Sequence, residues 1–306
     1  MLRAVPPMEG EPTARASGAR TALRPWLLAF LLMAGAAVFQ RLTGPTHPER
    51  GGFELAGQSL RYRLPRSGTT PEDRRIEIPA PGTEASATLW FRRYPSAEPL
   101  TAREMRIERA TLVGELPAQP AAGKVEYFVE LRAGAATERI PESGRTVVLR
   151  FRDPVPASVL VAHVALMFAA MLVGLRAGLA AAAGASGLKR LTWITLIGLS
   201  AGGMIFGPLV QKYAFGSYWT GWPLGYDLTD NKTLIMWLAW VVAAIVVGRG
   251  TRKNARRSRV AVILAAVTMV AVYLVPHSLG GSELDRDAVE QGADPRDAIR
   301  TGRPPG

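Results

Sequence analysis

The sequence predicts a membrane all-α bundle of about five transmembrane helices, with an all-β domain inserted between the first and the second. Two observations lead to this fold class. Apolar residues gather in runs close to the ~20 residues that cross a bilayer, and after the first run the hydrophobic pattern changes from continuous to alternating. The 306-residue chain has no cysteine, which excludes disulfides, thiolate metal sites and a cysteine nucleophile.

The apolar runs place the predicted spans. They lie at Trp26–Phe39, Val155–Leu175, Leu191–Val210, Leu234–Gly248 and Val260–Pro276. The first and fourth runs are short, so we expect flanking residues to complete them, or the stems of basic residues to reach the interface. Glycines at the end of the second predicted helix, Gly174 and Gly178, and in the third run, among them Gly198 and Gly202, are expected to let helices approach closely.

These runs divide the chain into domains. Residues 25–42 are predicted to form the first transmembrane helix, an uncleaved signal anchor, with a cleaved signal peptide as the alternative. Residues 155–277 are predicted to form a four-helix transmembrane domain. The polar segments 1–24 and 281–306 are predicted to be disordered tails, because they lack apolar periodicity.

Residues 50–153 are predicted to form an antiparallel β-sandwich. Leu60, Tyr62 and Leu64 alternate with arginines, and comparable strands follow between turn signals. The segment Leu116–Leu131 resembles the turn and following strand of fibronectin type III and related immunoglobulin-like domains, with Tyr127 near the strand start. The resemblance implies an immunoglobulin-like sandwich, a fold used for adhesion, spacing or docking.

The formal charge of +12 is concentrated in short loops. The densest cluster is Arg249–Arg259, and Arg176, Lys189 and Arg190 follow the second span. Loops rich in Arg and Lys stay in the cytoplasm, so this pattern predicts a topology signal and no nucleic-acid partner. We therefore expect a multi-pass protein of the bacterial inner membrane, with a cytoplasmic N-terminus and a periplasmic sandwich and C-terminus.

An aromatic loop, residues 211–233, joins the third and fourth spans on the predicted periplasmic side. It carries Tyr218, Trp219, Trp222 and Tyr226, with Lys212 and Lys232 at its two ends. Thr229, Asp230 and Asn231 stand where the N-cap of the fourth span is expected. Trp and Tyr also gather at membrane surfaces for purely interfacial reasons, so this loop alone does not identify a site.

Two histidines fall on the same predicted side of the membrane as the loop. His163 lies in the second span and His277 just beyond the fifth. Imidazoles are common ligands of haem iron, and aromatic rings can form a platform for a porphyrin. Lys212 and Lys232 are candidates to pair with haem propionates. The alternative to haem ligation is a structural role, in which His163 forms a hydrogen bond with a neighbouring helix and His277 caps a helix end.

The order of these features resembles the haem-handling proteins of cytochrome c assembly, in which a tryptophan-rich external loop is flanked by two external histidines. Gly216–Thr233 matches the loop, and His163 and His277 match the histidines. The resemblance implies that the two histidines ligate the iron of haem b, that Tyr218, Trp219 and Trp222 hold the macrocycle, and that Asp227 orients it.

The sequence thus supports two expectations about function. One is an accessory protein at the periplasmic face that handles haem in cytochrome or respiratory assembly. The other is a membrane-anchored adaptor whose β-sandwich docks a protein partner. No P-loop, H-E-x-x-H or G-x-S-x-G motif occurs, so we do not expect an enzyme.

Overall fold

The computed structural model describes residues 13–82, 84–142, 144–249, 254–277 and 280–300. In these ranges, five helices are long and apolar enough to cross a membrane: Leu23–Thr43, Ala157–Ala182, Leu188–Phe215, Leu228–Gly248 and Ala255–Leu274. This agrees with the number and order of the predicted spans. The first and fourth spans are 21 residues each, because flanking residues extend both short apolar runs.

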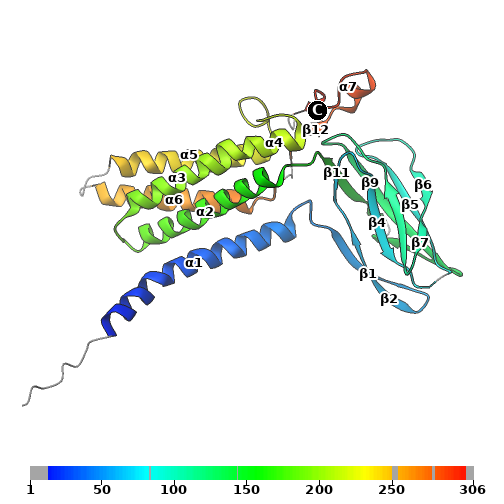
Figure 1. Ribbon diagram of the computed structural model, residues 1–306, viewed down its shortest axis with the longest axis horizontal. Coiled ribbons are helices and arrows are strands. Elements are labelled where there is room, and N and C mark those ends of the chain that lie inside the picture. The colour runs from blue at the N-terminus through cyan, green and yellow to red at the C-terminus, as the bar shows by residue number, and fades with distance from the viewer. Residues whose placement is uncertain (1–12, 83, 143, 250–253, 278–279, 301–306) are drawn as a thin grey trace, which may run out of the picture.

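Four of the spans are continuous helices, and the third is made of three pieces. The continuous ones are α1 (Thr13–Thr43), α2 (Ala157–Ala182), α5 (Leu228–Gly248) and α6 (Ala255–Leu274). The third joins α3 (Leu188–Leu199), a π-helical segment η1 (Ser200–Phe206) and α4 (Gly207–Phe215). The spans run side by side, and the β domain lies at one end of them (Figure 1). We call this the β-domain end of the helices.

Glycines allow the spans to pack closely, as predicted. A Cβ atom on Gly174 would lie 2.8 Å from the Met269 side chain and 2.9 Å from the ring of Trp240. A Cβ atom on Gly178 would lie 2.7 Å from Ala266. Trp240 is fully buried, so a large ring fills the space that Gly174 leaves open.

The N-terminus is helical over part of the segment for which the sequence predicts disorder. The helix α1 begins at Thr13, within the predicted tail 1–24, while residues 1–12 lie outside the described ranges. The prediction rests on the absence of an apolar pattern before Leu23. A helix that is already nucleated by a span can continue into a polar segment of moderate helix propensity, because propagation costs less than nucleation.

The β domain has three groups of strands. A six-stranded sheet has the order β3-β11-β9-β5-β6, with β10 paired to β9; β4, β8 and β7 form a second sheet, and β1 and β2 a hairpin. The strands are β1 (Glu49–Leu55), β2 (Gln58–Leu64), β3 (Ser67–Thr69), β4 (Arg74–Pro79), β5 (Ser86–Arg93), β6 (Thr101–Glu104), β7 (Arg106–Glu108), β8 (Thr111–Leu116), β9 (Lys124–Ala133), β10 (Ala136–Ile140) and β11 (Val147–Arg152).

One hydrophobic core joins these strands. It includes Leu64 of the hairpin, Leu89 of the six-stranded sheet and Ile76 of the three-stranded sheet, all without exposed surface. Tyr127 is also fully buried, and its hydroxyl donates to the carbonyl of Pro65 at 2.8 Å. Burial raises the pKa of Tyr127 well above its ordinary value. Sheets that share a core agree with the predicted β domain, and its immunoglobulin-like identity stays a prediction.

The segment after the last span is folded where the sequence predicts a disordered tail from residue 281. It contains β12 (Glu283–Leu284), α7 (Arg286–Glu290) and β13 (Ile299–Arg300), and β12 pairs with β13. We call residues 280–300 the C-terminal strap; residues 301–306 of the predicted tail lie outside the described ranges. Its polar composition gives no local signal of order, because the contacts that order it are long-range.

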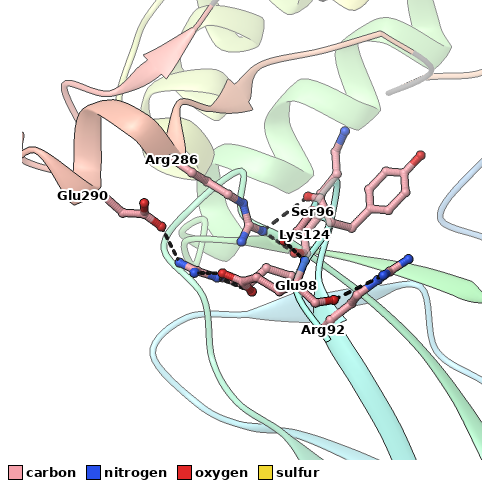
Figure 2. Close-up of polar contacts among 8 residues, drawn as sticks. Arg92, Ser96, Glu98, Lys124, Arg286 and Glu290 are labelled. Atoms are coloured by element: carbon pink, nitrogen blue, oxygen red, sulfur yellow. Dashed lines mark hydrogen bonds and ion pairs between the residues drawn. The ribbon is translucent and has the colours of Figure 1, made fainter. Parts of the chain in front are cut away.

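Charged contacts hold the strap on the β domain (Figure 2). Glu290 accepts from Arg93 at 3.0 Å, and Glu283 pairs with Lys124. Arg286 reaches the main chain of the sandwich and donates to the carbonyl of Lys124 at 2.5 Å. Arg286 is partly buried, and this burial lowers its pKa from the ordinary value.

Candidate functional site

The aromatic loop starts and ends at defined backbone positions. Gly216 ends α4 in a left-handed conformation with φ +84°, which glycine adopts without strain. Asp227 is the N-cap of α5, and its Oδ1 accepts from the N–H groups of Thr229 at 2.8 Å and Asp230 at 3.3 Å. The N-cap therefore lies earlier than the predicted Thr229–Asn231, because the fourth helix begins at Leu228.

Hydrogen bonds inside the loop fix its shape. Asp230 accepts from the backbone N–H of Thr220 at 2.6 Å, and Asn231 accepts from that of Trp222 at 2.7 Å. Between them, Gly221 lies so close to α5 that a Cβ atom there would be 2.7 Å from the Asp230 side chain. The first turn of α5 thus acts as a template on which the preceding loop is folded.

The fixed loop displays large side chains at the surface. Trp222, Leu224 and Tyr226 are 65%, 71% and 62% exposed. Tyr218 is also exposed, whereas Trp219 is half-buried and donates from Nε1 to the carbonyl of Trp222 at 3.1 Å. Trp219 and Trp222, predicted to act together as a platform, therefore differ: one supports the loop and the other faces outward.

The two lysines have local partners. Lys212 donates to the carbonyl of Gly216 at 2.6 Å, and its ammonium lies 5.4 Å from the centre of the Tyr218 ring. Lys232 is buried and donates to the carbonyl of Val275, just beyond the end of α6. Lys232 thereby ties the start of α5 to the end of α6.

The two predicted histidine ligands lie on different elements at the β-domain end of the helices. His163, on α2, places Nδ1 at 2.8 Å from the carbonyl of Gly202 in η1. His277 follows α6; its Nδ1 contacts the side-chain amide of Gln40 on α1, and its ring meets Tyr273 edge-on with centroids 6.1 Å apart. The hydrogen bonds of the two imidazoles go to Gly202 and Gln40, while burial and then the charges of Lys232 and His163 lower the pKa of His277 to about 4.

A cavity of about 180 Å³ lies beside His277. Methionines of three helices, including Met167, Met236 and Met269, give it a largely apolar lining, and Gln40 closes it with His277. Pockets for ligands of ordinary size measure roughly 300–1,000 Å³, so this cavity is too small for a porphyrin as it stands. Among the described residues, no group of three or more potential metal ligands occurs.

A buried polar junction joins the loop, the strap and the sandwich. Asp227 is 3% exposed, and its Oδ2 accepts from the backbone N–H of Ser282 at 3.0 Å and from its hydroxyl at 3.3 Å. Gln211 bridges the hydroxyls of Thr220 and Ser282, at 3.0 Å each. Arg150 of β11 donates to the carbonyl of Ser282. We call Asp227, Ser282, Gln211 and Arg150 the junction cluster.

The electrostatics of the junction cluster favour a fixed arrangement. Burial lowers the pKa of Arg150, and the nearby carboxylates of Asp227 and Glu283 oppose that shift. The Arg150 guanidinium also lies over the ring of Phe215, 4.4 Å from its centre, at the end of α4. Asp227, predicted to orient a porphyrin, is thus committed to capping α5 and holding Ser282.

Sequence reasoning missed Ser282 and Arg150. Each looks ordinary locally: Ser282 stands in a polar segment, and Arg150 is one of several arginines in alternating strands. Of the other two members of the junction cluster, Asp227 was predicted as a site residue in a different role, and Gln211 carried a signal because it is a polar residue near the end of a span. In comparisons with known proteins, neither a family model nor a curated protein matches this chain.

Proposed function

We propose that this chain is a non-catalytic adaptor of the bacterial inner membrane, anchored by its helices and docking a protein partner at the periplasmic face. One observation carries the proposal. Trp222, Leu224 and Tyr226 are mostly exposed on a loop whose backbone is held by Asp230 and Asn231. We call these three exposed residues, two aromatic and one aliphatic, the aromatic display.

The physical case for docking is preorganisation. Exposed aromatic residues supply much of the energy of protein interfaces, and Trp and Tyr are enriched at their centres. A loop that is ordered before binding avoids the entropy cost of becoming ordered on binding. The aromatic display meets both conditions, because the hydrogen bonds that shape it come from the start of α5, not from a partner.

The junction cluster supports the adaptor proposal by fixing the sandwich beside the loop. Arg150 belongs to the sandwich, Asp227 to the loop and Ser282 to the strap, and the three meet directly. A partner that contacts the aromatic display can therefore contact the sandwich in a constant geometry. This is the property that a membrane adaptor requires.

Photo-crosslinking in cells tests the adaptor proposal. A benzoylphenylalanine at position 224 should give a discrete protein–protein adduct, while the same group at Ile205, which is 58% exposed on the third span, should give only lipid adducts. The alternative is that the aromatic residues only anchor the loop at the membrane–water interface. Lipid adducts alone at position 224 would support that alternative and overturn the docking proposal.

Haem handling is the second candidate, and one observation favours it. The contact of His163 Nδ1 with the carbonyl of Gly202 fixes the ring and leaves Nε2 as the nitrogen for a ligand bond, an arrangement common among metal-binding histidines. Absorption spectra of the detergent-purified protein, oxidised and reduced, test this proposal. A Soret band that becomes weaker in His163→Ala and in His277→Ala would support haem binding. A colourless protein from cells supplied with haem would refute it.

A further inference from the structure

A cleft of about 670 Å³ lies between the β domain and the membrane helices. Its lining is unusually basic, with one glutamate, Glu77, against seven arginines. The arginines are Arg41, Arg63, Arg66, Arg74, Arg75, Arg150 and Arg152. We call this the arginine cleft.

Several elements bring these side chains together. Arg150 and Arg152 are alternate residues of β11 and therefore point to the same face of the sheet. Arg41 lies in the last turn of α1, close to the end of the first span at Thr43. Phe215, where the third span ends, completes the lining from the membrane side. The cleft thus lies at the level where two candidate spans leave the bilayer.

The positive charge of the cleft is mostly uncompensated. Arg75 pairs with Glu77 at 2.6 Å and Glu108 at 2.5 Å. Within the described ranges, no ion pair reaches the arginines at positions 41, 63, 66, 74 and 152. The buried Nε atoms of Arg66 and Arg150 also have no hydrogen-bond partner there. Like charges gathered in this way repel one another, so an anion in the cleft would stabilise the fold.

We propose that the arginine cleft binds the phosphate group of an anionic phospholipid from the surrounding bilayer. Guanidinium groups bind phosphate oxygens in a two-pronged geometry, and basic pockets beside membrane helices are suited to lipid headgroups. The volume lies within the range of ordinary ligand pockets. This inference is independent of the docking proposal, because it uses a different surface and a different ligand.

The apolar part of the cleft distinguishes a lipid from a soluble phosphate. Val210, Ala214 and Phe215 of α4 line the membrane side of the cleft. Ala214 is already buried, but Val210 and Phe215 are partly exposed, so an acyl chain or glycerol group can cover them, whereas inorganic phosphate or pyrophosphate would leave them uncovered. The combination of arginines above and apolar side chains below therefore favours the lipid as the source of the phosphate.

Native mass spectrometry of the full chain in a neutral detergent tests this proposal, with phosphatidylglycerol, phosphatidylcholine and inorganic pyrophosphate as probes. The test variant is Arg74→Gln/Arg152→Gln, since both side chains are exposed and free of ion pairs within the described ranges. The matched control is Arg109→Gln/Arg132→Gln, which removes the same charge from exposed sandwich positions outside the cleft.

We expect the wild type to retain one phosphatidylglycerol molecule in preference to phosphatidylcholine. The cleft variant should bind it about tenfold more weakly or worse, because charge-assisted hydrogen bonds are lost, while the control should change by less than about twofold. Equal loss in the cleft variant and control would show general surface attraction and overturn the site. Pyrophosphate binding that the cleft variant abolishes, without preferential lipid binding, would overturn the lipid assignment and identify a soluble ligand.

Discussion

Replacing Asp227 by asparagine separates two roles of its carboxylate. Oδ1 caps α5, and an asparagine oxygen can do the same. Oδ2 accepts from the N–H and hydroxyl of Ser282, and an asparagine NH₂ placed there would face the Ser282 N–H donor to donor. Asp227→Asn should therefore preserve the start of α5 and release the strap.

The size of the effect follows from the contacts that are lost. A hydrogen bond to a charged group contributes about 1.5–3 kcal/mol, and Asp227 is almost completely buried, so little solvent screening reduces that figure. Opening of the strap should become roughly ten to a hundred times more frequent. Asp227→Ala should have the same effect and also destabilise the first turn of α5, by about 1 kcal/mol, because the cap is lost.

Hydrogen exchange of the protein in nanodiscs measures this directly. Amides of the strap, such as that of Asp285, which donates to Ala298 at 2.8 Å, should exchange faster in Asp227→Asn, while those of α5 should not. Asp287→Ala, which removes an exposed carboxylate from the same strap, should leave both regions unchanged. Unchanged exchange in the strap of Asp227→Asn would refute the reasoning and show that the pairs of Glu283 and Glu290 suffice to hold it.

Other predictions concern packing, the sandwich, pH and orientation. Gly174→Ala should destabilise the bundle by about 1–3 kcal/mol in thermal unfolding, because the new methyl meets Trp240, and Gly35→Ala, with open space around it, should not. Tyr127→Phe should cost about 1 kcal/mol by loss of its bond to Pro65, and an unchanged melting temperature would contradict this. Arg93 lowers the pKa of Glu98, so the contribution of this ion pair to folding stability should be complete at a pH above the ordinary pKa of 4.5 and should be lost as the pH falls through the lowered pKa. An NMR titration that gives Glu98 its ordinary pKa would contradict the pairing. Because the chain has no cysteine, single cysteines report sidedness: an impermeant thiol reagent should label Thr137→Cys on the sandwich from outside but not Ser186→Cys between α2 and α3, and the reverse pattern would invert the proposed topology.

The sequence was sufficient for features that depend on local pattern. Hydropathy located the five candidate spans, alternation located the β domain, and the glycines of the second and third spans indicated close packing. Each of these signals is a continuous run or a short repeat of neighbouring residues, so a short window of sequence contains it. The N-cap at Asp227 was missed by a few residues, as helix ends depend on neighbouring contacts, whereas α1 begins at Thr13, well before the predicted start at residue 25.

The junction and the arginine cleft were beyond local reasoning. Ser282 meets Asp227 across 55 positions of sequence, and nothing near either residue specifies the other. The arginines of the cleft come from α1, β2, β4, β11 and, for Arg66, the link between β2 and β3, and each one alone has the sequence pattern of a solvated surface residue. Tertiary structure brings them together, and without an aligned family no pattern in a single chain could reveal that proximity.

The position of Ser282 in chain order has a consequence for biogenesis. The sandwich is synthesised before four of the five spans, and the residue that joins it to the aromatic loop follows the last of them. Before the strap is made, the β domain is connected to the helices through the short segments after α1 and before α2, and through contacts with the end of α4 such as that of Arg150 with Phe215. The junction can therefore close only after all five candidate spans have been synthesised, and a chain interrupted before residue 280 would lack the contacts of Ser282 that fasten the β domain to the loop.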